Sequence, residues 1–334
     1  MSSKKNLNYH SKIYALLRKK ILRWYDENGR KLLPWKTNDI YKIWISEIML
    51  QQTQVKTVIP YYENFIKKYP NLNSLSNASL DEIMKLWSGL GFYKRAENIH
   101  KTCIKIHDKF NGKFPKNYED ILSLPGIGRT TASAIVTFSG YEKRSILDGN
   151  VKRFLSRLFS IQNSSTTVNS LWRISEDLLP NERSSDFIQA YMDIGSLVCK
   201  KLNPLCKTCP VSSNCKSYPY KISKSNIRKL STKKDINKRN IWALAILNQD
   251  GDFYLEKISY NNLWNGLYSA PLFHKKSDLF EWVDSFNLGK SLESKIWKFS
   301  HDLSHIKFTF NVMVCNVKSH KKVSLSDDNW YNLS

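Results

Sequence analysis

The chain has 334 residues, which is long enough for two domains that each bury a core. No apolar stretch is long enough to cross a membrane, and no continuous apolar segment follows the N-terminus, so the sequence argues against a membrane or secreted protein and favours the cytoplasm. The formal net charge of +23 favours a polyanionic partner such as nucleic acid, although a genome whose codon bias enriches lysine would also produce it.

The first two-thirds of the chain carry the periodicity of amphipathic helices. Residues 11–28 place apolar side chains near the helical period, and Gly29 suits the position after the helix. A second helix is expected over residues 41–58, with Pro60 marking its end. Further helices are expected over residues 79–87, 94–109, 118–123, 129–139, 150–160 and 185–199.

The composition changes over residues 216–240, where nine basic residues stand against one acid. Such a segment is typical of a solvated linker, and its charge would suit a place beside DNA. The apolar run 241–247 and the segment 253–256 then predict a hairpin, and residues 307–314 alternate as a strand. We therefore expect a helical domain over residues 1–222, a basic linker over 223–239 and a mixed α/β domain over 240–334.

Four of the six cysteines lie close together, with the spacing Cys199-x6-Cys206-x2-Cys209-x5-Cys215. A disulfide framework would instead spread its bridges over a small secreted domain. Four thiolates so close in sequence can converge on one metal centre, which leaves an iron–sulfur cluster and a zinc ion open. Zinc sites usually pair two CxxC units, and this segment has one with unequal arms on either side. Because no second cofactor motif accompanies the cysteines, a structural role is favoured over redox turnover.

A turn with the sequence LPGIGRT lies between two expected helices at residues 124–130. Gly126 and Gly128 allow positive φ and close backbone approach, and the next helix begins with free N–H groups, so the turn can hold a phosphate oxygen. By itself the pattern also fits an ordinary loop between helices. Asp148 follows one helix later in the segment LDGNVKR, where its simplest role is to cap the helix that begins near Asn150.

These motifs together resemble the helix–hairpin–helix DNA glycosylase superfamily. The likeness extends to LPW at residues 33–35, to WISEIMLQQTQV at 44–55, to GLGFYKRA at 89–96 and to the cysteine loop at 199–215. Over essentially its whole length the sequence is similar to adenine DNA glycosylases of the MutY type. The resemblance implies a mainly α catalytic domain with one 4Fe–4S cluster on the four cysteines, followed by a Nudix-like α/β domain that recognises 8-oxoguanine.

The resemblance also assigns the chemistry, which needs a proton on the departing base and stabilisation of an oxocarbenium-like sugar. Glu47 would be the general acid toward adenine N7, because an apolar helix environment raises a carboxyl pKa; without the resemblance it would more often be an exposed helix residue. Asp148 would stay ionised and stabilise the cation, with Asn150 orienting it. Thr130 stands where endonuclease III relatives carry a Schiff-base lysine, so the enzyme would be monofunctional.

Several residues would read the DNA. The resemblance carries Gln51 and Gln52 to positions that enter the double helix near the mispair, and Phe92 to the residue that stacks beside oxidised guanine. The family usually has tyrosine there, so this chain keeps the ring and loses the hydroxyl. Considered without the resemblance, the two glutamines would be surface residues and Phe92 would be a core residue.

The last third carries its own likeness to the Nudix-type recognition domain, in LWNGLY at residues 263–268. The glutamates of a catalytic Nudix box are missing, so pyrophosphate hydrolysis is not expected. Ser304 and His305 correspond to the loop that senses the oxidised base, and Leu303 replaces the usual phenylalanine before them.

The sequence thus predicts a monomeric enzyme of the bacterial cytosol and nucleoid that acts on double-stranded DNA with A:8-oxoguanine or A:G mispairs. One alternative is an endonuclease III-like glycosylase for oxidised pyrimidines, which Thr130 and the context of Glu47 disfavour. The other is a degenerate iron–sulfur DNA-binding protein, which would require the loss of Glu47 or Asp148.

Overall fold

The structure is a computed structural model that describes residues 2–161, 167–218, 237–258, 266–302, 306–317, 325–326 and 329–332, with side chains from residue 12 onward. The chain divides into two compact units, Met1–Ile227 and Arg228–Ser334, and each is considered by itself. Most of the predicted linker lies outside the described residues, but its last part, 237–239, forms the start of a strand. No helix in the described ranges is long and apolar enough to span a membrane.

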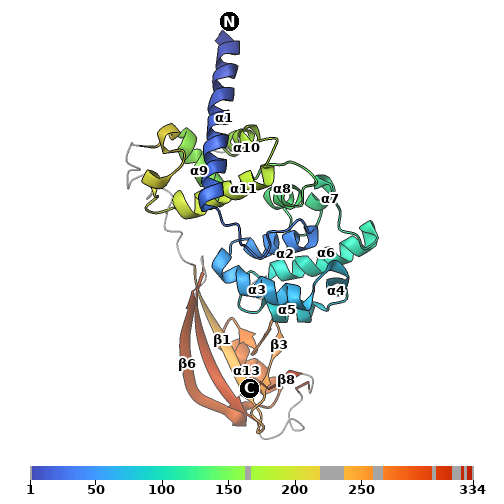
Figure 1. Cartoon of the computed structure of the whole chain (residues 1–334). Helices are drawn as coiled ribbons and strands as arrows, with labels where there is room; N and C mark the ends of the chain where they lie inside the picture. The colour runs from blue at the N-terminus through green and yellow to red at the C-terminus, as the bar shows by residue number, and fades with distance from the viewer. Residues whose placement is uncertain are drawn as a thin grey trace. The chain divides into compact units, whose positions relative to one another are not determined.

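The first unit is helical throughout its described residues (Figure 1). Its elements are α1 (Ser2–Asn28), α2 (Ile40–Leu50), α3 (Val55–Lys68), α4 (Leu72–Ser76), α5 (Leu80–Trp87), α6 (Lys94–Phe110), α7 (Tyr118–Leu122), α8 (Arg129–Phe138), α9 (Gly149–Phe159), α10 (Thr167–Leu178), α11 (Ser184–Asp193), the π-helical turn η1 (Ile194–Val198) and the 3-10 turns η2 (Cys206–Thr208) and η3 (Ser212–Asn214). The helices predicted over residues 79–87, 94–109, 118–123, 129–139 and 150–160 are confirmed within one residue at each end. The first helix begins at Ser2 instead of residue 11, and the stretch predicted over 185–199 is α11 followed by the π-helical turn η1. The sequence analysis did not predict α4 and α10.

The predicted helix over residues 41–58 is wrong, because two helices occupy this stretch. The first ends at Leu50, and Gln52 takes a left-handed backbone with φ 59°, a conformation that cannot continue a right-handed helix. The second helix then contains Pro60 instead of ending before it. Its proline removes one N–H donor, and the burial of Val58, Tyr62 and Phe65 compensates for that loss.

The apolar stripe of α1 forms much of the core that supports the unit. Leu17, Ile21 and Tyr25 are buried and pack in one cluster with side chains of α9 and α11, among them Phe154 and Tyr191. Burial of each large apolar side chain contributes about 1.5–3 kcal/mol, so the N-terminal helix is held to the α9–α11 layer by the hydrophobic effect. This layer supplies the helix caps and turns that shape the site.

In its described residues the second unit has a six-stranded mixed sheet, a separate two-stranded sheet of β3 and β4, and one α-helix, which confirms the expected α/β character. Its elements are β1 (Asn237–Leu247), β2 (Phe253–Tyr254), β3 (Glu256–Lys257), β4 (Tyr268–Ser269), β5 (Leu272–Phe273), α13 (Lys276–Ser285), the 3-10 turn η4 (Gly289–Ser291), β6 (Leu292–Asp302), β7 (Ile306–Asn316) and β8 (Trp330–Tyr331).

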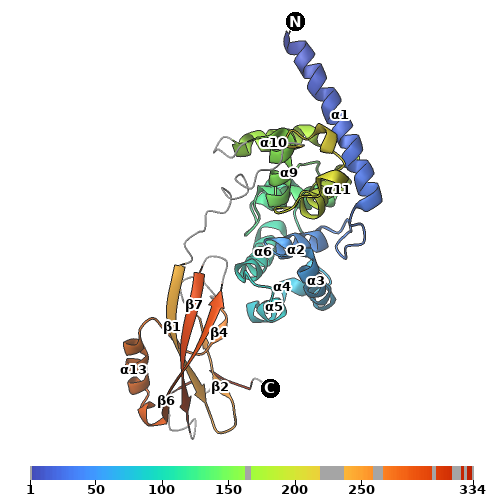
Figure 2. The ribbon, with the colours of Figure 1, turned by 90° about the vertical axis from the view of Figure 1, so that its left-hand side faces the viewer.

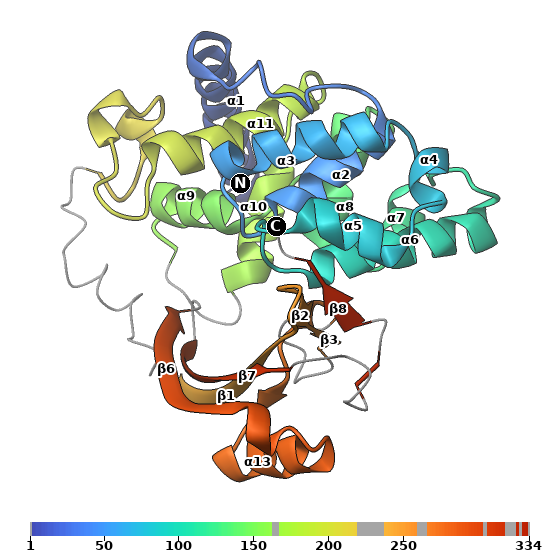
Figure 3. The same ribbon diagram turned by 90° about the horizontal axis from the view of Figure 1, so that it is seen from below.

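The larger sheet has the order β6-β7-β1-β2-β8, with β5 also paired to β1. The long strands β1 and β7 pair in parallel, and the other pairs are antiparallel. The predicted hairpin is confirmed, since Leu247 pairs with Phe253. Figure 2 shows α13 along one face of the curved sheet, where its buried Leu279 and Val283 meet Leu244 of β1, and Figure 3 shows this layer from below.

Candidate active site

The side chain of Glu47 lines a pocket in the first unit. The cap of α2 fixes the start of this helix, because the Asp39 carboxylate accepts hydrogen bonds from the N–H groups of Tyr41 and Lys42 at 3.0 and 3.4 Å. The helix is buried on most sides, and Glu47 faces a cavity of about 240 Å³. The lining residues are Leu33, Trp35, Lys36, Thr37, Asn38, Ile43, Ser46, Glu47, Phe138, Ser185 and Gln189.

The electrostatics of the pocket keep Glu47 protonated near neutral pH. Burial of the carboxyl group, and second the negative charge of Asp148, raise the pKa of Glu47 to about 8. A carboxylic acid with this pKa holds a proton that it can donate, which is the property expected from the sequence. The same effect shows that α2 and the start of α9 bring these two carboxyl groups into electrostatic range.

Asp148 is the N-cap of α9, as the simplest reading of the sequence predicts. Its carboxylate accepts a hydrogen bond from Val151 N at 2.7 Å and another from Asn150 Nδ2 at 3.1 Å. Burial raises the pKa of Asp148 on balance, although these hydrogen bonds and the charge of Arg153 act in the opposite direction. Asn150 is itself held by Arg153, whose Nη2 donates to its Oδ1 at 2.9 Å, so Asn150 orients the carboxylate.

The wall of the pocket is held by contacts that sequence reasoning missed. Asp193 is fully buried, and its carboxylate accepts from Arg30 N, Nε and Nη2 at 2.8, 2.9 and 2.7 Å and from Gln189 Nε2 at 2.9 Å. This ion pair fixes the start of the loop that carries Leu33 and Trp35 into the pocket. The partners are 163 residues apart in the chain, so no local pattern could have indicated the contact.

In the hairpin before α8, only one of the two glycines has a backbone conformation that favours glycine. Gly126 has φ 76°, and a Cβ there would lie 2.4 Å from Asn98 Nδ2. Gly128 has φ −98° and open space around it, so this residue does not use the positive φ that glycine allows. It forms the N-cap of α8 without a side-chain cap, which suits close approach of a phosphate to the helix N-terminus.

Residues at the end of α2 reach this hairpin. The Gln51 amide donates to Gly126 O at 3.2 Å and to Thr131 Oγ1 at 3.3 Å, while Gln52 beside it is exposed. Phe92, on the turn before α6, is also exposed, with 49% of its surface accessible, and its φ is 50°. It is therefore no core residue. Ser304 and His305 of the predicted sensing loop lie outside the described residues.

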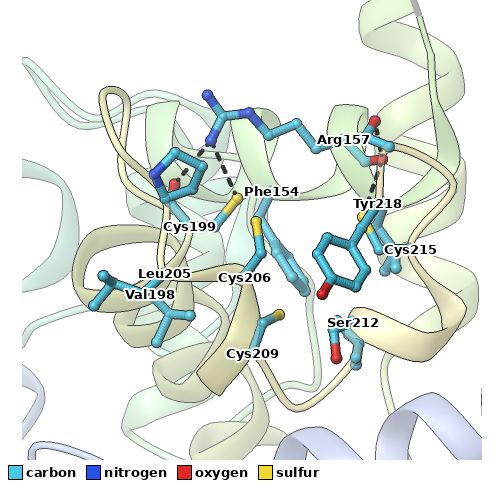
Figure 4. A pocket seen from close by; sticks show the side chains of 14 residues that line it. Phe154, Arg157, Val198, Cys199, Leu205, Cys206, Cys209, Ser212, Cys215 and Tyr218 are labelled. Carbon is cyan, nitrogen blue, oxygen red and sulfur yellow. Dashed lines mark hydrogen bonds between the residues drawn. The ribbon is translucent and has the colours of Figure 1, made fainter. Parts of the chain in front are cut away.

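The four clustered cysteines line one small pocket, which Figure 4 shows from close by. Arg157 of α9 holds the loop, since its Nη1 donates to Lys200 O at 2.7 Å and lies 3.4 Å from Cys199 Sγ. Among the described residues, no group of three or more His, Cys, Asp or Glu side chains is arranged around a single metal ion.

The helical fold, the hairpin before α8, the buried acid Glu47 and the nearby carboxylate of Asp148 define a DNA glycosylase of the helix–hairpin–helix class. Residues 45–177 match the family described as "HhH-GPD superfamily base excision DNA repair protein". Among solved structures, a thermostable thymine-DNA glycosylase aligns with 29% identity and a TM-score of 0.58 over 62% of this chain and 97% of its own. A non-covalent endonuclease III–DNA complex, at 21% identity and a TM-score of 0.55, covers 65% of this chain and 98% of its own and shows the same fold.

Relatives in sequence identify the family of DNA glycosylases to which the chain belongs. An adenine DNA glycosylase of Buchnera aphidicola subsp. Baizongia pistaciae is 44% identical over 94% of this chain and 90% of its own length. The human adenine DNA glycosylase is 40% identical over 59% of this chain and 38% of its own length. The chain belongs to the adenine DNA glycosylase family, base excision repair enzymes that hydrolyse N-glycosidic bonds. Iron–sulfur clusters are typical of this family and of the endonuclease III type.

Proposed function

We propose that this enzyme removes adenine paired with 8-oxoguanine or guanine in double-stranded DNA, and that it does so by hydrolysis alone, as a monomer. The observation that carries the proposal is the acid pair. Glu47 lines a pocket, and the pKa of its carboxyl group is raised to about 8. The carboxylate of Asp148 lies close enough to Glu47 to contribute to this rise. Two carboxyl groups with separated roles are what cleavage of a glycosidic bond to a sugar requires. The cytoplasmic location stays a prediction.

In the proposed reaction, Glu47 donates its proton to N7 of adenine, so that the base leaves as a neutral molecule. The bond between the base and C1′ of deoxyribose breaks, and positive charge develops on the sugar. The negative charge of Asp148 stabilises this cation, and Asn150 keeps the carboxylate oriented through its 3.1 Å hydrogen bond. Water then adds to C1′ and loses one proton, which restores the protonated form of Glu47, and the product is an abasic site.

Thr130 decides what happens after base release. A lysine amine at this hairpin position would form a Schiff base with the sugar and lead to strand cleavage, and a threonine hydroxyl cannot. The proposed enzyme therefore leaves both strands intact. The same residue argues against an endonuclease III-like activity on oxidised pyrimidines.

Recognition of the mispair is proposed to combine two surfaces. On the helical unit, Gln51 and Gln52 fill the gap left by the extruded adenine, Phe92 stacks beside the opposite base, and Gly126 and Gly128 let the hairpin approach a phosphate. The exposure of Gln52 and Phe92 supports this role. On the second unit, Ser304 and His305 are proposed to form hydrogen bonds with 8-oxoguanine.

Cys199, Cys206, Cys209 and Cys215 are proposed to hold one 4Fe–4S cluster. Their thiol chemistry and their place around one pocket fit this group. When bound, the cluster would cross-link the loop over residues 199–215 and so stabilise the end of the helical unit. Arg157 and Arg153 already tie this loop to α9 through the carbonyls of residues 199–201.

Cleavage of a labelled duplex with adenine opposite 8-oxoguanine tests the proposal under single-turnover conditions, with and without hot alkali. We expect strand breaks only after alkali, because base release leaves an alkali-labile abasic site. Breaks without alkali would contradict the hydrolytic reaction. No product from protein with an intact cluster would favour the degenerate DNA-binding alternative, and a substrate with oxidised thymine serves as the control for endonuclease III-like activity.

A further inference from the structure

Arg95, in the first turn of α6, joins two separate turns of the helical unit. It is 6% exposed. Its Nη1 donates to Ile48 O, Met49 O and Gln51 O at 3.1, 2.5 and 2.8 Å, at the end of α2.

The other donors of Arg95 reach the turn before α6. Its Nη2 donates to Leu90 O and Gly91 O at 3.4 and 2.8 Å, and its Nε lies 3.4 Å from Phe92 O. The guanidinium carbon also lies 5.3 Å from the centre of the Trp87 ring and 5.4 Å from that of Phe92. One side chain therefore contacts six carbonyl oxygens on two segments that are about forty residues apart in the sequence.

The charge of Arg95 is compensated by dipoles. Among the described residues no ion pair involves this guanidinium, and burial lowers its pKa to about 10, so it stays charged at neutral pH. The carbonyls at the C-terminus of α2 carry partial negative charge that favours a cation there, whereas the N-terminus of its own helix disfavours one. A buried cation in this place is costly for α6, and the contacts to α2 and the turn compensate for that cost.

Both of the joined turns carry a residue with an unusual backbone. Gln52 follows Gln51 with φ 59°, and Phe92 follows Gly91 with φ 50°. Neither is glycine, and such conformations cost about 1–3 kcal/mol each unless the surroundings enforce them. Both side chains are exposed, although each adjoins a carbonyl that Arg95 binds.

We propose that Arg95 is a positioning residue for DNA recognition: it holds the end of α2 and the Phe92 turn in one fixed arrangement, so that Gln52 and Phe92 are presented to the mispair together. This inference rests on the DNA-reading roles given under the proposed function. Arg95 acts through these two residues and does not touch the reacting atoms. Arg95 binds the last carbonyls of α2, C-terminal to Glu47, whereas the N-terminus of α2 is capped by Asp39 and the loop that lines the pocket is held by the Arg30–Asp193 ion pair. We therefore expect Arg95 to affect binding more than chemistry.

The substitution Arg95→Lys tests the proposal, because an ammonium group keeps the charge but cannot reach six carbonyls with a planar fork. We expect the affinity for a duplex with a non-cleavable adenine analogue opposite 8-oxoguanine to fall about tenfold, measured by fluorescence anisotropy. The single-turnover rate at saturating enzyme and its pH dependence should change little. Arg144→Lys is the matched control, since Arg144 also lies over a ring, 3.8 Å from the centre of Tyr118, away from the two turns.

A double-mutant cycle with Phe92→Ala separates positioning from general destabilisation. Phe92→Ala alone should weaken binding about tenfold, through lost stacking. If Arg95 acts in part through the Phe92 turn, the double variant should lose clearly less than the roughly hundredfold that independent effects would give. Additive losses, or wild-type affinity of Arg95→Lys, would overturn this inference and leave the proposed function intact. Wild-type affinity of Phe92→Ala would overturn the DNA-reading role of Phe92, and this inference with it, while the cleavage assay would still decide the proposed function.

A second variant covers the case that Arg95→Lys does not fold. Gly91 has φ 75° and open space where a Cβ would stand, so Gly91→Ala strains the turn without entering the core. We expect the same weaker binding, an unchanged pH dependence and no further loss when Phe92→Ala is added. Wild-type affinity of this variant would show that the geometry of the turn does not matter and would contradict the proposal.

Discussion

The carboxyl groups of Glu47 and Asp148 lie in electrostatic range of each other, and burial together with the charge of Asp148 raises the pKa of Glu47 to about 8. Asp148 has what Glu47 lacks, namely hydrogen bonds from Val151 N and Asn150 Nδ2 that favour its ionised form. Burial still raises the pKa of Asp148 on balance, but these hydrogen bonds and the charge of Arg153 act against that rise, whereas burial and the charge of Asp148 both raise the pKa of Glu47. This is the arrangement by which one site can hold both an acid and an anion at neutral pH.

The substitution Glu47→Gln should abolish base release and leave DNA binding largely intact. The amide fills the same space but has no proton to give, so we expect the single-turnover rate to fall by at least about a hundredfold. Affinity should stay within a fewfold of wild type, measured on the same duplex. Glu63→Gln, an exposed residue of α3, is the matched control. Wild-type turnover by Glu47→Gln would refute its assignment as the general acid.

The pH dependence of stability should reveal the same group. The pKa of Glu47 is 4.5 in the unfolded chain and about 8 in the folded one, so the folded state binds more protons between these values. Stability contributed by the neutral acid is therefore present below pH 4.5 and is lost as the pH rises toward 8, at about 1.4 kcal/mol per pKa unit. Glu47→Gln should melt at a higher temperature than wild type at pH 8, with little difference at pH 5. A pH-independent difference would argue against the raised pKa.

Local periodicity predicted most helices because the buried stripe of a helix recurs every three to four residues. It failed between α2 and α3, where the apolar pattern continues although the backbone of Gln52 turns left-handed. That turn depends on Arg95, which binds the carbonyl of Gln51 from a helix 44 residues further along the chain. A contact between residues so far apart in the chain cannot be predicted from the local sequence pattern.

The likeness to known motifs identified the residues of the candidate site, but the sequence did not predict which side chains around it are buried or exposed. It indicated Glu47, Asp148 and the four cysteines, and the structure brings the two acids into range and the cysteines around one pocket. Without the likeness, an aromatic residue such as Phe92 is expected in the core, yet it is half exposed. The reverse holds for Arg95, a charged residue that is almost fully buried, because burial is decided by distant partners.

The two glycines of the hairpin should respond differently to alanine. At Gly126 a Cβ would lie 2.4 Å from Asn98 Nδ2 and φ is 76°, so Gly126→Ala should cost about 1–3 kcal/mol of stability and weaken DNA binding. At Gly128 the backbone is extended and the space is open, so Gly128→Ala should fold like wild type. Thermal melting and anisotropy of both variants check this. Equal destabilisation by the two substitutions would contradict the geometry of the turn.

The cysteine loop should carry iron and acid-labile sulfide in equal amounts, about four of each per chain. Cys209→Ser should lower both contents and the melting temperature, because the loop over residues 199–215 loses its cross-link. Cys315→Ala, in a strand of the second unit, should keep the wild-type iron content. Metal analysis of anaerobically purified protein decides between the two open metals, since zinc without sulfide would refute the cluster.

Removal of the chain from residue 226 onward should separate catalysis from recognition of the oxidised base. The helical unit, Met1–Ile227, has its own core and contains Glu47, Asp148 and the hairpin, so excision opposite guanine should persist at a reduced rate. The preference for A:8-oxoguanine over A:G should fall by a larger factor than the excision rate on A:G, because Ser304 and His305 are lost with the second unit. The ratio of single-turnover rates on A:8-oxoguanine and A:G duplexes measures it. An unchanged ratio, with both rates lowered equally, would mean that the second unit supports binding in general and does not sense the oxidised base.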